Sequence, residues 1–206
     1  HSQGLGITGF ANGLLRSWLK SNNYDYDILS ERLLHENPCI LKDYDVILLS
    51  NHHEYLSSRT FDALEIHAMR GGHQIYLSAN DLAWQTRHSE DGTKITCFRG
   101  LWDQDPYLEK IPCHVTRQNP YSPINRPEDV LKAVRTPSFG NGSWFEDTDF
   151  IVETPDHWIF NGLDLRKGDT FGELLAAGEQ DMSTQRSPQH DVLLRGTRTI
   201  FKDPSK

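Results

Sequence analysis

Residues 45–57 constrain the fold more than any other stretch of the chain. The apolar run at 46–49 is too short for a helix and is typical of a parallel strand buried on both faces. Polar residues follow at once, and helix-forming sequence resumes at Ser58. In an open α/β sheet, ligands bind beyond the carboxyl ends of the strands. The residues from His52 to Tyr55 are therefore expected where such a fold places its chemistry, although a loop that only caps the next helix has a similar composition.

The surrounding patterns predict an α/β fold with a doubly wound sheet. Apolar residues recur at helical spacing within residues 1–23, and residues 24–29 alternate as a strand does. A connection over 31–44 precedes the apolar strand. Ser58 is the expected N-cap of a helix that stops at Gly71-Gly72, and residues 73–79 form the next predicted strand. The order helix, strand, strand, helix, strand suits a doubly wound sheet.

The second half of the chain is less regular. A turn at 90–92 leads to a predicted strand at 94–99, and six of the ten prolines then fall between Pro106 and Pro137. We interpret 101–149 as a long irregular excursion, in which only 128–134 has a helical pattern. We therefore expect one α/β domain over 1–206 with an irregular, partly β insertion. Later ordered segments are expected at 150–152, 157–160, 192–194 and 199–201.

Composition limits the classes of function. The net charge of −8 argues against nucleic acid or an anionic membrane as the main partner, and no apolar run is long enough to span a bilayer. Cys39, Cys97 and Cys113 lack metal-site spacing and are expected to be reduced thiols of a cytoplasmic protein. The chain starts without an initiator Met, so we expect a fragment of a longer polypeptide.

His52 and Glu54 are the leading candidates for chemistry. In an extended segment their i, i+2 spacing points both side chains to one side, with His53 and Tyr55 on the other. A neutral imidazole can take a proton from water, and a carboxylate can bind a hard cation. The pair alone is a weak signal. His53 is expected to be structural, and Tyr55 to pack in the core or behind the site.

Two later segments carry further candidates. Glu179 and Asp181 repeat the i, i+2 spacing after small residues, although a solvated turn with two surface carboxylates fits the same pattern. His157 lies between Asp156 and Trp158, where a hydrogen-bonded, semi-buried histidine is the alternative. No nucleophile elbow, P-loop or dinucleotide fingerprint occurs.

Four segments, taken in order, resemble one known family. Residues 44–57 are similar to the YxVxxxxxHxEYxS stretch of the large (beta) subunit of N,N-dimethylformamidase and its relatives. Residues 71–84 resemble the GGxxxYLGxNxxxW of that family, residues 156–160 its DHWxF and residues 177–181 its GxExD. The resemblance implies a flavodoxin-like, class I glutamine-amidotransferase-like fold. It also implies association with a small partner subunit and homo-oligomers.

The resemblance further implies hydrolysis of a small amide at a mononuclear Fe(III) held by two tyrosinates and a glutamate. Glu54 matches the glutamate ligand, and His52 and Glu179 match the residues that handle the attacking water. Tyr55, Asn80, Asp181 and His157 are expected around the substrate or behind the ligands. The tyrosine ligands of the family precede the matched part, and neither Tyr24 nor Tyr26 can be matched to them. Either the chain is a fragment or its iron site is incomplete.

Two hypotheses follow from these observations. The first is a metal-assisted amidase in which Glu179 returns to the carboxyl edge of the sheet, within one water molecule of His52. The second is a non-catalytic glutamine-amidotransferase-like module that binds a small ligand or a partner subunit.

Overall fold

The computed structural model describes residues 7–78, 81–98, 104, 128–134, 148–176, 183 and 188–196. The chain divides into two compact units, His1–Lys132 and Ala133–Lys206. Their boundary falls within the predicted excursion at 101–149, most of which lies outside the described residues. The expectation of one domain over 1–206 stays a prediction.

The first unit begins with α1 (Ile7–Ser21), which confirms the predicted helix. The strand predicted over 24–29 is wrong, because this segment has no strand partner and runs along the end of α1 instead. The ring of Tyr24 stacks on Trp18 at 5.6 Å, and the Tyr24 N–H donates to the Leu19 carbonyl at 3.0 Å. Alternating tyrosines here cover a helix rather than extend a sheet.

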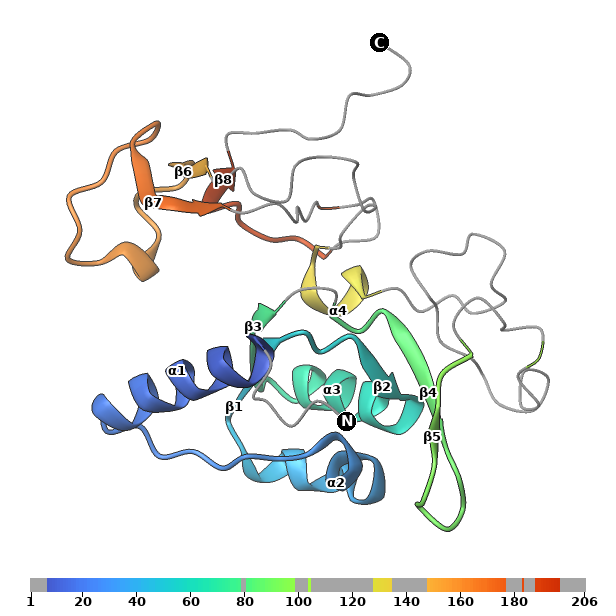
Figure 1. Cartoon of the computed structure of the whole chain (residues 1–206). Coiled ribbons are helices and arrows are strands. Elements are labelled where there is room, and N and C mark those ends of the chain that lie inside the picture. Colours follow the sequence, from blue (N-terminus) through green and yellow to red (C-terminus); the bar gives the residue numbers. More distant parts are fainter. Residues whose placement is uncertain are drawn as a thin grey trace. The chain divides into compact units, whose positions relative to one another are not determined.

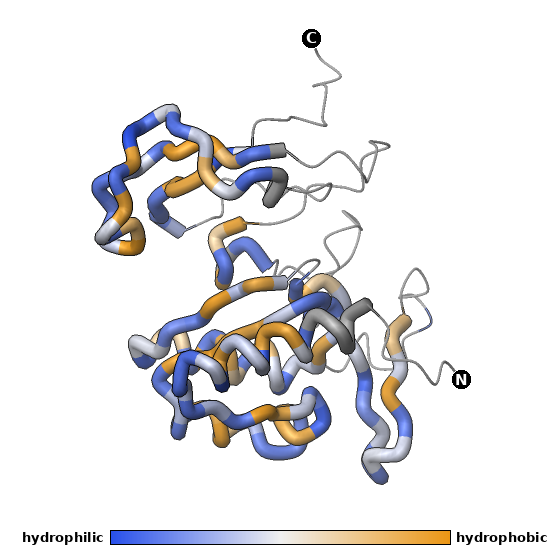
Figure 2. Tube along the Cα trace, turned by 60° about the vertical axis from the view of Figure 1, so that its left-hand side comes forward, coloured by the Kyte–Doolittle hydropathy of each residue, from blue (hydrophilic) through white to orange (hydrophobic). Residues whose placement is uncertain are grey.

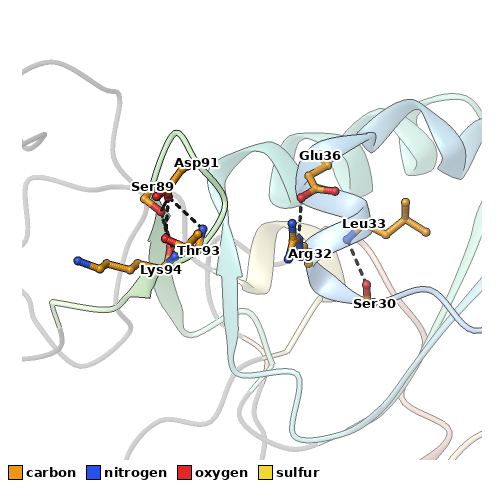
Figure 3. Close-up of polar contacts among 8 residues, drawn as sticks. All are labelled: Ser30, Arg32, Leu33, Glu36, Ser89, Asp91, Thr93 and Lys94. Carbon is orange, nitrogen blue, oxygen red and sulfur yellow. Dashed lines mark hydrogen bonds and ion pairs between the residues drawn. The ribbon is translucent and has the colours of Figure 1, made fainter.

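Two short helices occupy the segment predicted as a connection. In α2 (Glu31–Glu36), Ser30 is the N-cap and its hydroxyl accepts the Leu33 N–H at 3.1 Å (Figure 3). The 3₁₀ helix η1 (Pro38–Asp43) follows, with proline at its start. The helix α2 ends before Pro38, which has no N–H to donate to its carbonyls.

A parallel β–α–β unit contains the predicted central strand. The strand β1 (Val46–Asn51) pairs in parallel with β3 (His73–Ser78), and α3 (Ser58–Met69) connects the two (Figure 1). The N-cap of α3 is Ser57 rather than Ser58, and its hydroxyl accepts the Thr60 N–H at 3.2 Å. Gly71, at φ +85°, follows the helix and confirms the predicted stop.

The prediction that β1 is buried on both faces is wrong. Leu49 is buried, but Val46 is 48% exposed, and Ile75 and Leu77 of the paired strand are 42% and 57% exposed. The buried side packs against α3 in a core formed by Leu34, Leu41, Leu49, Leu56, Phe61, Ala63, Leu64 and Leu82. Figure 2 shows polar and apolar residues interleaved along much of the described chain, as expected where elements have one buried and one exposed side.

A second sheet follows the order β2-β4-β5. The strand β2 (Tyr55–Ser57) pairs in parallel with β4 (Trp84–His88), which pairs antiparallel with β5 (Ile95–Thr96). Only these two residues of the strand predicted at 94–99 are confirmed. The predicted turn before β5 is present, and Asp91 accepts hydrogen bonds there from Ser89 and Thr93 (Figure 3). These bonds lower the pKa of Asp91 to about 2. The short helix α4 (Asp129–Lys132) completes the described part of this unit.

The second unit contains an antiparallel sheet in the order β7-β6-β8. Its strands are β6 (Thr148–Val152), β7 (Thr170–Ala176) and β8 (Leu194–Gly196), and the 3₁₀ helix η3 (Trp158–Phe160) lies between β6 and β7. The strand predicted at 150–152 is confirmed, and the one predicted at 192–194 begins at Leu194. The one predicted at 199–201 lies outside the described residues.

The described part of the chain is thus a mixed α/β protein with several small sheets. The α/β class is confirmed, and the doubly wound, flavodoxin-like arrangement stays a prediction. None of the helices described combines the length and apolar character needed to cross a bilayer.

Candidate functional site

The candidate site is the loop 52–54, which joins β1 to β2 in the first unit. Asn51 ends β1 with a positive φ of 67° and pairs in register with Ser78, the last residue of β3. The loop therefore leaves the carboxyl edge of a parallel strand pair, where open α/β sheets place their ligands. This position agrees with the sequence prediction.

His52 lies at the surface of this loop. Its side chain is exposed, and among the described residues it has no hydrogen bond or ion pair. An exposed imidazole with both nitrogens available can exchange protons with water. The geometry thus permits the predicted role of His52 as a base.

Glu54 is partly buried and held by Trp84. The indole N–H of Trp84 donates to Oε1 of Glu54 at 3.0 Å, and the Trp84 main-chain N–H donates to the Glu54 carbonyl at 2.9 Å. Trp84 is only 5% exposed, so its ring has little freedom to turn away. Sequence reasoning did not assign this role to Trp84, although the residue ends the second family-like segment.

His53 anchors the loop, as its expected structural role requires. Its N–H donates to the Ser78 hydroxyl at 3.0 Å, and its carbonyl accepts the Leu82 N–H at 2.9 Å. Its Nε2 lies 3.6 Å from Oε2 of Glu31. The other oxygen of Glu31 accepts the Ser57 N–H at 3.2 Å and the Thr60 hydroxyl at 2.9 Å. Glu31 therefore connects α2, the loop and the start of α3.

Residues 81–84 are buried and lie beside the loop. Asp81 is fully buried and lies 3.6 Å from Nζ of Lys132, whose side chain is only 2% exposed. Glu128 and Asp129 are buried in the same unit. Burial, together with the charge of Asp81, raises the pKa of Tyr76. Sequence reasoning did not pair Asp81 with Lys132, because no local pattern connects Asp81 with the distant helix α4.

A second pair of side chains also went unpredicted. The imidazole rings of His35 and His88 stack at 3.7 Å with 14° between their planes. Nδ1 of His35 and Nε2 of His88 are buried and have no hydrogen bond among the described residues. Burial lowers the pKa of both rings. Neither residue belongs to a recognisable motif.

The remaining predicted residues are not all brought together. Tyr55 begins β2 in register with Trp84 and is 40% exposed, so packing in the core is wrong, whereas a place behind the site stays a prediction. Asn80, Glu179 and Asp181 lie outside the described residues. His157 is in the second unit, where its Nδ1 accepts the Ile159 N–H at 3.3 Å and caps η3. This matches the alternative interpretation of His157 as a hydrogen-bonded, semi-buried side chain.

The described residues fit an iron site only in part. Glu54 offers the carboxylate oxygen that a hard cation prefers. Tyr24 and Tyr26 pack along α1, where the Tyr26 hydroxyl donates to the Arg16 carbonyl at 3.5 Å. No group of three or more His, Cys, Asp or Glu in the described part of the chain could hold a metal ion. Further ligands would have to come from other residues.

The family is shown by comparison with known proteins. The profile of a family described as "N,N-dimethylformamidase beta subunit-like, C-terminal" matches residues 5–203. A protein named N,N-dimethylformamidase beta subunit from Paracoccus aminophilus is 28% identical over 176 residues, or 80% of this chain. One of the same name from Alcaligenes sp. is 27% identical over 176 residues. The chain spans 23% of the length of each relative. It belongs to the N,N-dimethylformamidase beta subunit-like, C-terminal family.

Proposed function

We propose that the chain supplies part of the active site of an amide hydrolase that acts on small linear amides such as N,N-dimethylformamide. The observation that carries this proposal is the fixed carboxylate of Glu54 beside the exposed imidazole of His52, at the end of a parallel strand pair. Membership of the family adds the substrate class, which the printed names of the relatives give for those proteins.

Different residues of the chain would transfer protons and surround the substrate. His52 takes a proton from the attacking water, because its imidazole is open to solvent and a neutral imidazole can accept a proton. Glu179 shares the handling of this water and of the proton that the leaving amine needs. Asn80, Asp181, Tyr55 and His157 are proposed to lie around the substrate or behind the catalytic groups.

Glu54 is proposed as the carboxylate ligand of Fe(III). When bound, this ion polarises the amide carbonyl and acidifies water. Two tyrosinates would complete the ligand set.

The fold and assembly belong to the same proposal. The β1–α3–β3 unit supports a flavodoxin-like, glutamine-amidotransferase-like core, in which further strands would extend the sheet. The name "beta subunit" of the relatives supports a partner subunit, and we propose that this partner is small and that the assembly contains several copies of each. We propose the cytoplasm as the compartment, since the three cysteines are an odd number and are expected to be reduced thiols.

The test compares Glu54→Gln with Glu90→Gln in the complete polypeptide, purified with any copurifying subunit. Glu90 is an exposed carboxylate in the β4–β5 turn and serves as the matched control. We expect the unmodified protein and Glu90→Gln to bind iron, absorb visible light through tyrosinate-to-iron charge transfer, and release dimethylamine from N,N-dimethylformamide. Glu54→Gln should lose iron and turnover together. A colourless, iron-free protein without turnover of any small amide would contradict the proposal and favour a non-catalytic binding module.

A further inference from the structure

The Trp84 side chain belongs to β4 and contacts the candidate ligand Glu54 from a different segment of the chain. Its indole N–H donates to Oε1 of Glu54 at 3.0 Å. A side-chain donor on one carboxylate oxygen fixes the rotation of the whole group, because the two oxygens share one plane. The orientation of the Glu54 carboxylate is therefore set by another strand.

The main chain reinforces this contact. Tyr55 and Trp84 are paired in register between β2 and β4. The pairing continues into the loop, where Trp84 N–H donates to the Glu54 carbonyl at 2.9 Å and Leu82 N–H donates to the His53 carbonyl at 2.9 Å. Two consecutive loop carbonyls are thus held by one neighbouring segment.

That neighbouring segment is itself immobilised by burial. Leu82, Ala83 and Trp84 are 2%, 0% and 5% exposed, and Leu82 adopts a positive φ of 57°. Asp81 at its start is buried against Lys132. A donor on such a rigid segment loses little freedom when it binds a carboxylate, so the bond is pre-organised.

We propose that Trp84 is a positioning residue for Glu54, and that its indole N–H orients the carboxylate toward the metal and substrate side of the loop. This inference rests on the proposed function. Trp84 acts through Glu54 and touches neither substrate nor metal. Hydrogen-bonded groups behind a metal ligand typically account for about 10- to 100-fold in metal affinity or activity.

The first experiment detects the bond in the metal-free protein. Nuclear magnetic resonance of the indole N–H groups, with Trp84→Phe used to assign the Trp84 signal, reports the hydrogen bond directly. We expect this signal to shift in Glu54→Gln, where a neutral acceptor replaces the carboxylate, while the signal of Trp18 on α1 stays in place. An unmoved Trp84 signal would overturn the inference, whatever the catalytic activity.

The second experiment measures the consequence. Trp84→Phe keeps a large buried ring and removes only the donor, whereas Leu64→Ala destabilises the hydrophobic core of the first unit at a residue outside the loop. We expect Trp84→Phe to lower iron affinity and kcat about 10- to 100-fold with little change in KM. The Leu64→Ala protein should keep iron affinity and kcat near those of the unmodified protein at a temperature where both variants are folded. Equal losses in both variants, or none in Trp84→Phe, would overturn the inference.

The two proposals fail in different ways. If the unmodified protein binds no iron and hydrolyses no amide, the proposed function fails, and the indole signal of the metal-free protein still decides whether Trp84 positions Glu54. If the unmodified protein is active and Trp84→Phe matches it in iron affinity and kcat, only the inference fails.

Discussion

The indole nitrogen of Trp84 lies 3.0 Å from a carboxylate oxygen of Glu54, thirty residues earlier in the chain. This bond joins the loop after β1 to the start of β4. It gives a candidate ligand a fixed orientation, whereas the neighbouring His52 stays open to solvent. A proton-transfer site beside a metal ligand requires a carboxylate with a fixed orientation and an imidazole that water can reach.

The buried Asp81–Lys132 pair predicts a large loss of stability when it is broken. Lys132→Met leaves the Asp81 carboxylate buried without this cation, so we expect the free energy of unfolding to fall by about 3–5 kcal/mol. Urea denaturation measures the change. Lys167→Met is the matched control, because Lys167 pairs with Glu153 while 72% exposed, and it should cost less than about 1 kcal/mol. Equal effects of the two variants would contradict the assignment.

The N-cap of α3 predicts a difference between two adjacent serines. Ser57 is buried and accepts the Thr60 N–H, whereas Ser58 is the first helical residue. Ser57→Ala should lower the free energy of unfolding by about 1 kcal/mol, and Ser58→Ala should lower it much less. Thermal unfolding followed by circular dichroism compares the two. A larger loss in Ser58→Ala would restore the boundary expected from the sequence alone.

The stacked pair His35–His88 predicts a stability that depends on pH. For His35, burial lowers the pKa most, and the charges of His88 and Arg59 add to this, while Glu31 and Glu36 oppose it. For His88, burial and Arg32 lower the pKa against the same two carboxylates.

Because both folded-state pKa values lie below the ordinary value of 6.5, the unfolded chain binds protons more readily. Stability is therefore complete above pH 6.5 and declines as the pH falls toward the lowered values. Both rings are partly exposed, so we expect this decline to stay below about 1 kcal/mol. Urea midpoints at pH 7.5 and 5.5 measure it. His88→Gln should reduce the difference, and the exposed His73→Asn should leave it unchanged.

The hydrophobic patterns predicted the β1–α3–β3 unit because these elements follow simple periodicities and end in clear stop signals. The strand β4 escaped prediction because it is buried yet carries Thr86, Arg87 and His88, so its composition gives no apolar run. For residues 24–29 the error was the opposite, since a strand was predicted where none forms. Their alternation resembles a strand, but the tyrosines pack along a helix.

The sequence predicted the loop 52–54 as a site, but it did not predict the residues that hold this loop in place. His52 and Glu54 stand out because polar residues directly follow an apolar strand. The partners that hold the loop, Trp84 and Glu31, and the Asp81–Lys132 pair below it, depend on tertiary contacts that no local spacing encodes. The resemblance to the family marked the segment of Trp84 without giving its contact.

The most direct test of the account is the rate of amide hydrolysis by His52→Asn, measured as dimethylamine release from N,N-dimethylformamide by the complete polypeptide loaded with iron. His73→Asn, at an exposed histidine that begins β3, is the matched control. If His52 takes the proton from water, kcat should fall about 100- to 10,000-fold in His52→Asn, with iron content unchanged and His73→Asn as active as the unmodified protein. Full activity of His52→Asn would contradict the central claim.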